Sequence, residues 1–375
     1  MNKTLGILGG GQLGRMLIQS AMNFNIPVRV LDPDAHAPCH TLGDQFVCGS
    51  FTDYETVYRF GQTVDVLTIE IEQVNVAALQ HLEAEGKTVW PQARVIEIIQ
   101  DKGAQKLFYQ HHGILTADFT LCDSQADIQK YAGPWPVMQK LRQLGYDGRG
   151  VIKLNNPADI SRAFSQPSLL EQVVDFDKEV AVIVARNQAG AIETFPTVEM
   201  NFHPQHNLVE FLIAPARIPE AIDQHARQLA TQIAETLQVV GVLAVELFVT
   251  TTGQVLVNEI APRPHNSGHH TIEGNVTSQF EQHLRAIFNW PLGDVATVQP
   301  AVMVNLLGEP GHTGVAYYQG LDAILQQSGV HVHLYGKRHT KPFRKMGHVT
   351  ITAGSIEAAL QTAHRVKQTL KVISV

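Results

Sequence analysis

The first ninety residues alternate short apolar runs with longer amphipathic stretches. Apolar runs at 5–8, 28–31 and 64–69 are separated by segments long enough for helices, the first of which begins at Gln12. Short strands that alternate with helices predict a parallel sheet with right-handed crossovers. We therefore expect an α/β, Rossmann-like domain over residues 1–91.

The rest of the chain has a mixed pattern that predicts an α+β fold. Helices are expected at 93–111 and 220–238, and strands at 137–140, 168–173, 179–185, 242–250 and 255–260. A Pro-Leu-Gly break at 291–293 opens a last segment with strands at 302–306, 331–334 and 348–353 and a helix from Ser355. We place a second domain at 92–292 and a small C-terminal domain at 293–375, and see no internal repeat.

The hairpin predicted at 242–260 carries two carboxylates. If its loop is Thr252-Gly253, Glu246 and Glu259 face each other across the strands, with Cβ atoms roughly 5 Å apart, where like charges are destabilising. A divalent cation removes that conflict, and Mg²⁺ held together with substrate phosphates suits such oxygen ligands. Asn258 adds a neutral oxygen if a bulge turns it inward. The alternative is a register slip that sends one glutamate to solvent.

Composition narrows the class of protein. With 44% apolar and 17% charged residues and a formal charge of −7, the chain is typical of soluble proteins, and we expect neither nucleic acid nor a membrane as partner. Cys39, Cys48 and Cys122 have no metal-ligand spacing and indicate free thiols in a reducing compartment. No leader is visible, and no apolar stretch approaches the ~18 residues of a membrane span. We expect a cytoplasmic enzyme.

A glycine-rich turn joins the first predicted strand to the first helix. Its residues, 9–14, read Gly-Gly-Gly-Gln-Leu-Gly and fit the G-x-G-x-x-G pattern, and Asp32 ends the next strand. Such a turn brings backbone amides and a helix N-terminus close to a phosphate or carboxylate. An NAD-dependent oxidoreductase is therefore an alternative, although this fold does not fix the ligand.

A second glycine-rich segment, residues 145–150, follows the predicted strand that ends at Lys140. Three glycines in six residues predict a flap whose amides close over phosphates, and Lys140 would meet those phosphates from the strand. The alternative is a flexible surface loop. Further on, Glu171 to Val174 end a strand that presents backbone groups to a base edge, and Glu179 lies eight residues beyond Glu171.

Five basic side chains lie within nine positions near the C-terminus: Lys337, Arg338, Lys341, Arg344 and Lys345. The cluster is either a solvated loop or a phosphate site. Pro342 stiffens the segment, and Gly336 and Gly347 bracket it at the ends of strands, which favours the phosphate site because the cations are then held in place.

Four stretches carry a resemblance to a known family. They are LGILGGGQLGRML at the N-terminus, the loop GYDGRG, the string NEIAPRPHNSGH from Asn258 to His269, and Tyr335-Gly336-Lys337 with Arg344-Lys345-Met346-Gly347-His348. In this order they resemble the ATP-grasp superfamily, and within it the family of 5-(carboxyamino)imidazole ribonucleotide synthases. The resemblance covers essentially the whole chain. It implies an ATP-grasp fold with an N-terminal pre-ATP-grasp domain and a small C-terminal domain.

The resemblance implies ATP and Mg²⁺ as cofactors, with Mn²⁺ as the alternative metal, and Glu246 and Glu259 as the metal ligands. The ATP contacts it implies are Lys102, Lys140, Gly145, Tyr146, Asp147, Gly148, Arg149, Gly150, Val151, Glu171, Gln172, Val173, Val174, Glu179, His203, Asn258 and Glu259. Bicarbonate and the aminoimidazole would face Tyr146, Asp147, Arg149, Arg263, His265 and Asn266. The ribotide phosphate would bind Lys337 and Arg344, with Glu70 or Glu72 lining the same cleft.

The implied reaction is ATP-dependent carboxylation of aminoimidazole ribonucleotide by bicarbonate in purine biosynthesis, carried out by a cytoplasmic homodimer. Bicarbonate is a poor electrophile, so it would first attack ATP to give carboxyphosphate, which a closed flap must protect from water. Asp147, His265 or the departing phosphate would accept the amine proton.

Two further alternatives stay open. A ligase that uses formate on a related purine ribotide would share the glycine turn and paired glutamates but lack the Pro-His-Asn-Ser-Gly-His string. A catalytically silent ATP-binding regulator would have little use for the metal pair. The chain also departs from the family pattern at Val151, where glutamine is common, at His270, where tryptophan is usual, and at residues 141–144.

Overall fold

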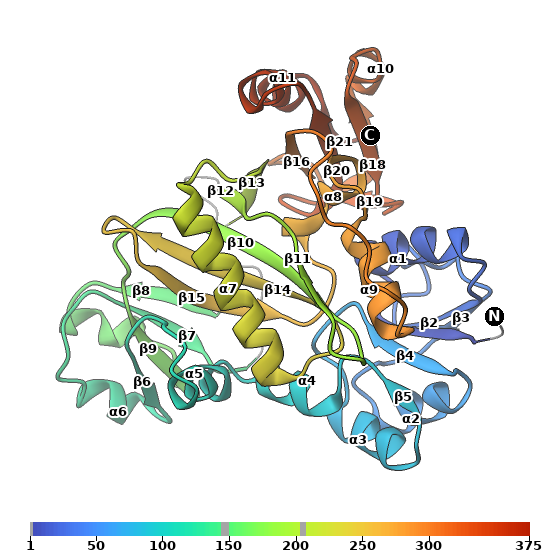
Figure 1. The fold of residues 1–375 in the computed structure, drawn as a ribbon. Helices are drawn as coiled ribbons and strands as arrows, with labels where there is room; N and C mark the ends of the chain where they lie inside the picture. The colour runs from blue at the N-terminus through green and yellow to red at the C-terminus, as the bar shows by residue number, and fades with distance from the viewer. Residues whose placement is uncertain (1–2, 144–149, 203–207) are drawn as a thin grey trace.

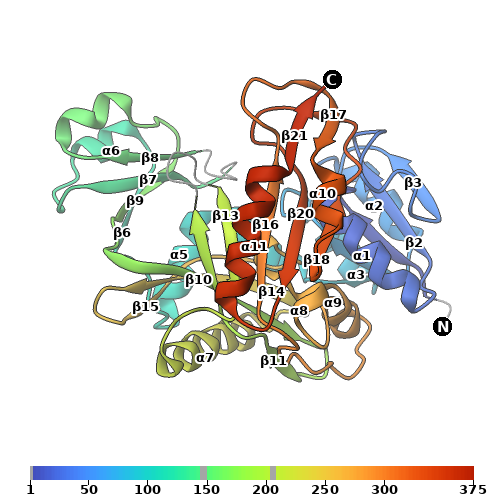
Figure 2. The ribbon, with the colours of Figure 1, turned by 90° about the horizontal axis from the view of Figure 1, so that it is seen from above.

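The computed structural model describes residues 3–143, 150–202 and 208–375. Figure 1 shows an N-terminal α/β part in blue, a small antiparallel lobe in green and a long central sheet that continues into the C-terminal segment in red. Seen from above, the green lobe and the blue part lie on opposite sides of the central sheet (Figure 2). No helix in these described ranges is long and apolar enough to cross a membrane.

The N-terminal part is the parallel sheet that the alternating pattern predicted. Its strands are ordered β3-β2-β1-β4-β5, and every pair in it is parallel. Since carboxyl ends of parallel strands meet at one edge, the glycine turn after β1, Asp32 on β2 and Glu70 after β4 come together. The elements are β1 (Leu5–Leu8), α1 (Gln12–Asn23), β2 (Val28–Asp32), β3 (Gln45–Cys48), α2 (Tyr54–Gln62), β4 (Val66–Ile69), α3 (Val76–Ala84) and β5 (Thr88–Val89).

The single helix predicted over 93–111 is wrong. The structure has two helices, α4 (Ala93–Gln100) and α5 (Lys102–His111), separated by Asp101 in an extended conformation. The Asp101 carboxylate accepts hydrogen bonds from the backbone N–H groups of Gly103 and Ala104, at 2.7 and 3.1 Å, and Arg142 holds it from the other side. This N-cap starts a new helix with Lys102 in its first turn.

The small lobe is an antiparallel sheet in the order β6-β9-β7-β8. Lys140 on β7 pairs with Val151 on β8, so the strands on either side of the second glycine-rich segment are neighbours. The lobe contains β6 (Phe119–Cys122), α6 (Gln125–Gln129), β7 (Val137–Leu141), β8 (Val151–Leu154), the 3-10 helix η1 (Pro157–Arg162) and β9 (Ser168–Gln172).

The central sheet begins with the glutamate hairpin and runs in the order β15-β14-β10-β12-β13-β16-β20-β18, with β11 beside β10. The helix α7 (Glu220–Leu237) covers one face through Ala226, Leu229, Ala230 and Ile233, which recur at helical spacing and are buried. The strands are β10 (Phe176–Arg186), β11 (Ile192–Thr194), β12 (Val198–Phe202), β13 (Val209–Ala214), β14 (Gly241–Thr250) and β15 (Val255–Ala261).

The C-terminal segment continues this same sheet. Phe211 on β13 pairs with Val304 on β16 (Ala301–Leu307), which pairs in turn with β20 (Lys345–Thr352), and that strand with β18 (Val330–Leu334). The basic cluster therefore lies beside β18 and β20, which belong to the same sheet as the glutamate hairpin. The remaining elements are η2 (Asn266–Gly268), α8 (Thr271–Gly274), α9 (Gln279–Ile287), β17 (Gly314–Gln319), α10 (Leu321–Leu325), β19 (His339–Thr340), α11 (Ile356–Thr369) and β21 (Lys371–Ser374).

Candidate active site

The predicted pair of glutamates is present on the hairpin β14–β15. Glu246 and Glu259 are direct cross-strand partners, but the predicted two-residue loop is wrong. The Thr250 N–H donates to the Gln254 carbonyl, at 2.8 Å, across a three-residue loop whose Gly253 has φ +82°. The register then shifts between Glu246 and Leu247, because Asn258 forms a bulge. The extra residue in the loop and the extra residue in the bulge offset each other in register, so Glu246 and Glu259 still face each other across the strands.

The two carboxyl groups have unequal pKa values. Burial, together with the charges of Glu259 and Glu179, raises the pKa of Glu246. The Lys102 ammonium, which contacts Glu259 Oε2, lowers the pKa of Glu259 and outweighs the opposing effect of its partial burial. The hairpin therefore offers one ionised carboxylate, Glu259, which is already paired with a lysine. The other, Glu246, keeps its proton to a higher pH than a glutamate usually does.

A second carboxylate, Glu171 on β9, lies between two lysines. Lys106 Nζ is 2.5 Å from its Oε1, and Lys140 Nζ contacts its Oε2 and lies 3.1 Å from Asn258 Oδ1. Burial alone would raise the pKa of Glu171, but Lys140 and Lys106 outweigh it and hold the pKa below its usual value. Lys140 thus connects the small lobe to the hairpin.

Lys106 was missed by the sequence reasoning. It lies one helical turn after Lys102 on the same face of α5, and this i, i+4 spacing is a signal that could have found it. Glu179 on β10 also belongs to this group. Burial raises its pKa to about 7, with Lys140 acting in the opposite direction and Glu259 adding to the rise.

The other side of the pair is formed by the Pro-Arg-Pro-His segment and the N-terminal domain. His265 Nε2 lies 3.5 Å from Glu246 Oε1, and Arg263 forms a 2.7 Å ion pair with Glu72. The Ser267 N–H donates to His265 Nδ1, at 3.3 Å, so this ring nitrogen is the acceptor and Nε2 carries the proton. His265 therefore presents a donor towards Glu246.

The N-terminal glycine turn uses its amides internally. The N–H of Gly10 donates to Asp32 Oδ2 at 2.6 Å, and those of Gly11 and Gly14 donate to the two oxygens of Glu70 at 2.8 Å each. These are the amides that would receive a pyrophosphate. Because carboxylates of the protein already accept from them, the turn argues against the NAD alternative.

The basic cluster is held by its own backbone. Lys337 Nζ donates to the Lys345 carbonyl at 2.7 Å and lies 5.6 Å from the centre of the Tyr335 ring, and Arg344 donates to the His339 carbonyl at 2.6 Å. The charge of Lys345 lowers the pKa of Glu246 against the larger effect of burial, so this lysine of the cluster is close enough to act on the glutamate pair.

Buried amide and imidazole groups join the His-Asn-Ser-Gly-His string to the C-terminal strands. Asn266 and Asn305 on β16 exchange two hydrogen bonds, at 2.9 and 3.0 Å, and the ring of His269 lies 4.8 Å from that of His348. His270, the departure from the family pattern, is buried, and its Nδ1 lies 3.1 Å from the Ser267 carbonyl oxygen. Burial lowers its pKa to about 4, so it packs as a neutral ring.

Not every predicted site residue belongs to the described part of the chain. Gly145, Tyr146, Asp147, Gly148, Arg149 and His203 are outside the described residues. Gly150 accepts a 2.8 Å bond from the Leu141 N–H, next to Val151. Val173 and Val174 follow directly on β9, and Val173 is exposed.

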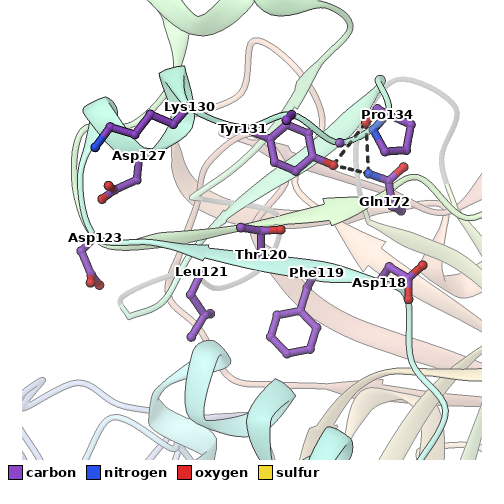
Figure 3. A pocket seen from close by; sticks show the side chains of 12 residues that line it. Asp118, Phe119, Thr120, Leu121, Asp123, Asp127, Lys130, Tyr131, Pro134 and Gln172 are labelled. Atoms are coloured by element: carbon purple, nitrogen blue, oxygen red, sulfur yellow. Dashed lines mark hydrogen bonds between the residues drawn. The ribbon is translucent and has the colours of Figure 1, made fainter.

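The side chain of Gln172 points away from the lysine cluster. Its Nε2 donates to the Tyr131 hydroxyl at 2.5 Å and to the Pro134 carbonyl at 3.1 Å, and it lines a cavity of about 670 Å³ on β6 (Figure 3). None of the site lysines or paired glutamates lines this cavity. The side chain of Gln172 is therefore not directed at the lysine cluster, and its backbone N–H already donates to the Asp118 carbonyl, at 2.8 Å.

The described residues contain no group of three or more histidine, cysteine, aspartate or glutamate side chains that could hold a metal. The hairpin supplies two carboxylates. The bulge residue Asn258, directly before Glu259 in the sequence, adds an amide oxygen. Such a set fits a cation whose coordination is completed by substrate phosphates and water, as Mg²⁺ usually is.

Three family models match the chain in succession. The ribonucleotide synthetase preATP-grasp domain matches residues 1–100, the ATP-grasp domain matches 107–280, and the phosphoribosylaminoimidazole carboxylase C-terminal domain matches 301–362. Together with the two-lobed fold and the cluster of lysines and carboxylates, these matches define an ATP-grasp ligase.

Relatives narrow this class to one family. The N5-carboxyaminoimidazole ribonucleotide synthase of Synechococcus elongatus is 38% identical over 95% of this chain and 92% of its own length. The chain therefore belongs to the N5-carboxyaminoimidazole ribonucleotide synthase family. It spans 65% of a longer relative, the chloroplastic phosphoribosylaminoimidazole carboxylase of Vigna aconitifolia, at 39% identity over 94% of this chain.

Solved structures agree with this family and confirm the expected fold. The synthetase from Thermotoga maritima has a TM-score of 0.92 and 43% identity and covers 100% of both chains. The synthase from Aspergillus clavatus, in complex with ADP and 5-aminoimidazole ribonucleotide, has a TM-score of 0.89 and 34% identity over 98% of both chains. The resemblance inferred from four stretches of sequence is thus confirmed.

Proposed function

We propose that this chain carboxylates 5-aminoimidazole ribonucleotide with bicarbonate and ATP, through carboxyphosphate, and releases N5-carboxyaminoimidazole ribonucleotide, ADP and phosphate. The observation that carries the proposal is the pair Glu246–Glu259, which has Lys102 and Lys140 on one side and His265 on the other. An acyl phosphate can form on the lysine side and be captured on the histidine side without leaving the cleft.

ATP binding is supported by the lysines that two lobes direct to one place. Lys102 and Lys140 reach the hairpin from α5 and β7, and the glycine-rich segment joins β7 to β8 beside Lys140. Transfer of the γ-phosphoryl group needs positioning and neutralisation of charge, and ammonium groups provide both. A Mg²⁺ ion held by Glu246 and Glu259 would neutralise further charge on the phosphates during transfer.

Bicarbonate and the aminoimidazole would lie near His265, Arg263 and Asn266. Arg263 is fixed by Glu72, and the amide of Asn266 is fixed by Asn305, so both side chains are held in place before substrate arrives. Since His265 presents a proton towards Glu246, it suits donation to a bicarbonate or carboxyphosphate oxygen. Asp147 and the departing phosphate are then the candidates for the base.

The ribotide phosphate would bind Lys337 and Arg344. Their backbone hydrogen bonds hold the cations at the end of β20, and arginine grips a phosphate dianion with paired hydrogen bonds. The carboxylate of Glu70 is committed to the amides of the glycine turn, so Glu72 is the better candidate to line this cleft.

We also propose a cytoplasmic homodimer and the division into domains at residues 91 and 292. The three free cysteines, two of them buried, suit a reducing compartment. The family resemblance supports the dimer, and the molar mass in solution tests it.

Phosphate release from ATP tests the reaction. Release should require bicarbonate, rise on addition of aminoimidazole ribonucleotide and match carboxylated product mole for mole. Formate in place of bicarbonate tests the alternative ligase. Release that depends on formate, or product formed without ATP, would reject the proposed function.

A further inference from the structure

Lys106 is a buried charge to which the proposed mechanism gives no task. Its side chain is 4% exposed, and its ammonium group lies 2.5 Å from Glu171 Oε1 and contacts the Thr116 hydroxyl. At this depth it has no access to a nucleotide in the cleft. Its role must be exerted through Glu171 or Thr116.

Glu171 is shared between this buried lysine and one at the cleft. Lys140 contacts the other carboxylate oxygen, is 15% exposed and also lies 3.1 Å from Asn258 Oδ1. The group therefore contains two ammonium ions and one carboxylate. One ammonium is sealed in, and the other borders the hairpin that carries the glutamate pair.

The excess positive charge has a consequence for ligand exchange. If Lys140 were the sole partner of Glu171, moving it to a phosphate would leave a buried carboxylate without a counter-ion, which is strongly unfavourable. With Lys106 in place, the carboxylate stays paired after Lys140 has left. The cost of releasing Lys140 is thereby reduced.

We propose that Lys106 is a positioning residue, the permanent counter-ion of Glu171, which allows Lys140 to exchange this carboxylate for a nucleotide phosphate. The inference rests on the proposed function in one respect, the placement of Lys140 at the phosphates. The Thr116 hydroxyl donates to the Val257 carbonyl at 2.6 Å, so it fixes the ammonium of Lys106 relative to β15, one residue before Asn258.

The first test replaces Lys106 by methionine, which keeps the length of the side chain and removes its charge. In Lys106→Met, Lys140 stays on Glu171, so the affinity for ADP, measured by calorimetry without other substrates, should fall about tenfold or more. The Michaelis constant for aminoimidazole ribonucleotide should change less than about twofold. Thr116→Val separates charge from placement: it keeps the charge of Lys106 and removes one contact of the ammonium, so ADP affinity should fall by less than about threefold.

The second test is rescue. In the double variant Lys106→Met/Glu171→Gln, the neutral amide no longer holds Lys140, so ADP affinity should return to within about threefold of that of Glu171→Gln alone. A purely structural role predicts the reverse, because two core substitutions would then add. An ADP affinity of Lys106→Met within about twofold of wild type would overturn the proposal.

The double variant decides the matter even where Lys106→Met does not fold. It removes both charges of a buried pair together, which proteins tolerate better than the loss of one. A gap of about tenfold or more between the double variant and Glu171→Gln would overturn the proposal. If wild-type protein binds ADP but forms no carboxylated product, the proposed function fails and the comparison of lysine variants stands.

Discussion

The glycine turn of the N-terminal domain and the glutamate hairpin of the central sheet differ in how firmly their polar groups are held by partners within the protein. At the turn, the carboxylates of Asp32 and Glu70 accept hydrogen bonds from backbone amides within one domain. At the hairpin, Glu259 is 43% exposed and its partner Lys102, which is 22% exposed, comes from another element on a long side chain. Both regions carry groups suited to a phosphate or a metal, and both have an internal partner.

The difference lies in what can move. At the glycine turn the carboxylates of Asp32 and Glu70 would have to leave, and each accepts two backbone N–H bonds, so exchange for a ligand breaks two hydrogen bonds at once. A lysine can rotate about four side-chain bonds and leave a carboxylate for a phosphate. A pattern in the sequence that matches a ligand site is thus functional only where the internal partner is exchangeable.

The largest expected effect is on the exchangeable side. Glu259→Gln removes a proposed metal ligand and the partner of Lys102, so we expect turnover to fall about 1000-fold, equivalent to ~4 kcal/mol of transition-state stabilisation. Carboxylated product per enzyme at saturating Mg²⁺ measures it. Glu309→Gln removes a carboxylate from a surface pair with Lys371 and should leave turnover unchanged. Normal activity of the hairpin variant would exclude Glu259 as a ligand.

The closed side should respond in stability rather than in ligand binding. Glu70→Gln leaves the part-buried amides of Gly11 and Gly14 with one neutral acceptor, which should cost about 2 kcal/mol of unfolding free energy. The control is Asp53→Asn, an exposed cap of α2 that asparagine replaces with little loss. Denaturant unfolding compares the two. If Glu70→Gln acquires affinity for NADH, the turn is a ligand site after all.

Arg344 tests a third arrangement, in which a cation donates to a backbone carbonyl, that of His339, and is paired with no carboxylate among the described residues. Arg344→Ala should raise the Michaelis constant for aminoimidazole ribonucleotide about tenfold, or ~1.4 kcal/mol, and change that for ATP little. Initial rates with each substrate varied in turn measure this, with Arg365→Ala on α11 as the control. Equal weakening of both substrates would mean that the cluster acts through general charge or folding.

Local patterns predicted the parts of the site that depend on neighbouring residues in sequence. Alternating apolar residues located β14 and β15, and the two glutamates on them faced each other as expected. The three-residue loop and the bulge at Asn258 were not foreseen, because two irregularities that cancel leave the pairing unchanged. The N-cap at Asp101 was missed because the apolar period continues across it.

Long-range pairings were beyond a single sequence. Nothing in residues 301–307 indicates that β16 pairs with β13, about ninety residues earlier, and so joins the basic cluster to the hairpin. The burial of Lys106 was likewise hidden, because lysine is among the side chains most often exposed. Both features depend on tertiary contacts, and they decide which charges meet at the glutamate hairpin.

The smallest expected effect separates the two glutamates of the hairpin. Burial and the neighbouring carboxylates raise the pKa of Glu246 above its usual 4.5, so the folded protein holds a proton that the unfolded chain has lost. The free energy of unfolding must therefore fall as pH rises from 4.5 towards about 8. Glu246→Gln removes that penalty.

In metal-free protein, Glu246→Gln should melt about 2–4 °C higher than wild type near pH 8, equivalent to ~1 kcal/mol, and less than about 1 °C higher near pH 5. Glu259→Gln should show no such gain, because Lys102 loses its partner and the pKa of Glu259 lies below the usual range. Thermal unfolding of both variants at the two pH values, in the presence of a chelator, makes the comparison. Equal shifts for the two variants, or a gain that does not grow with pH, would mean that the carboxylates of the hairpin are equivalent and that Lys102 does not distinguish them.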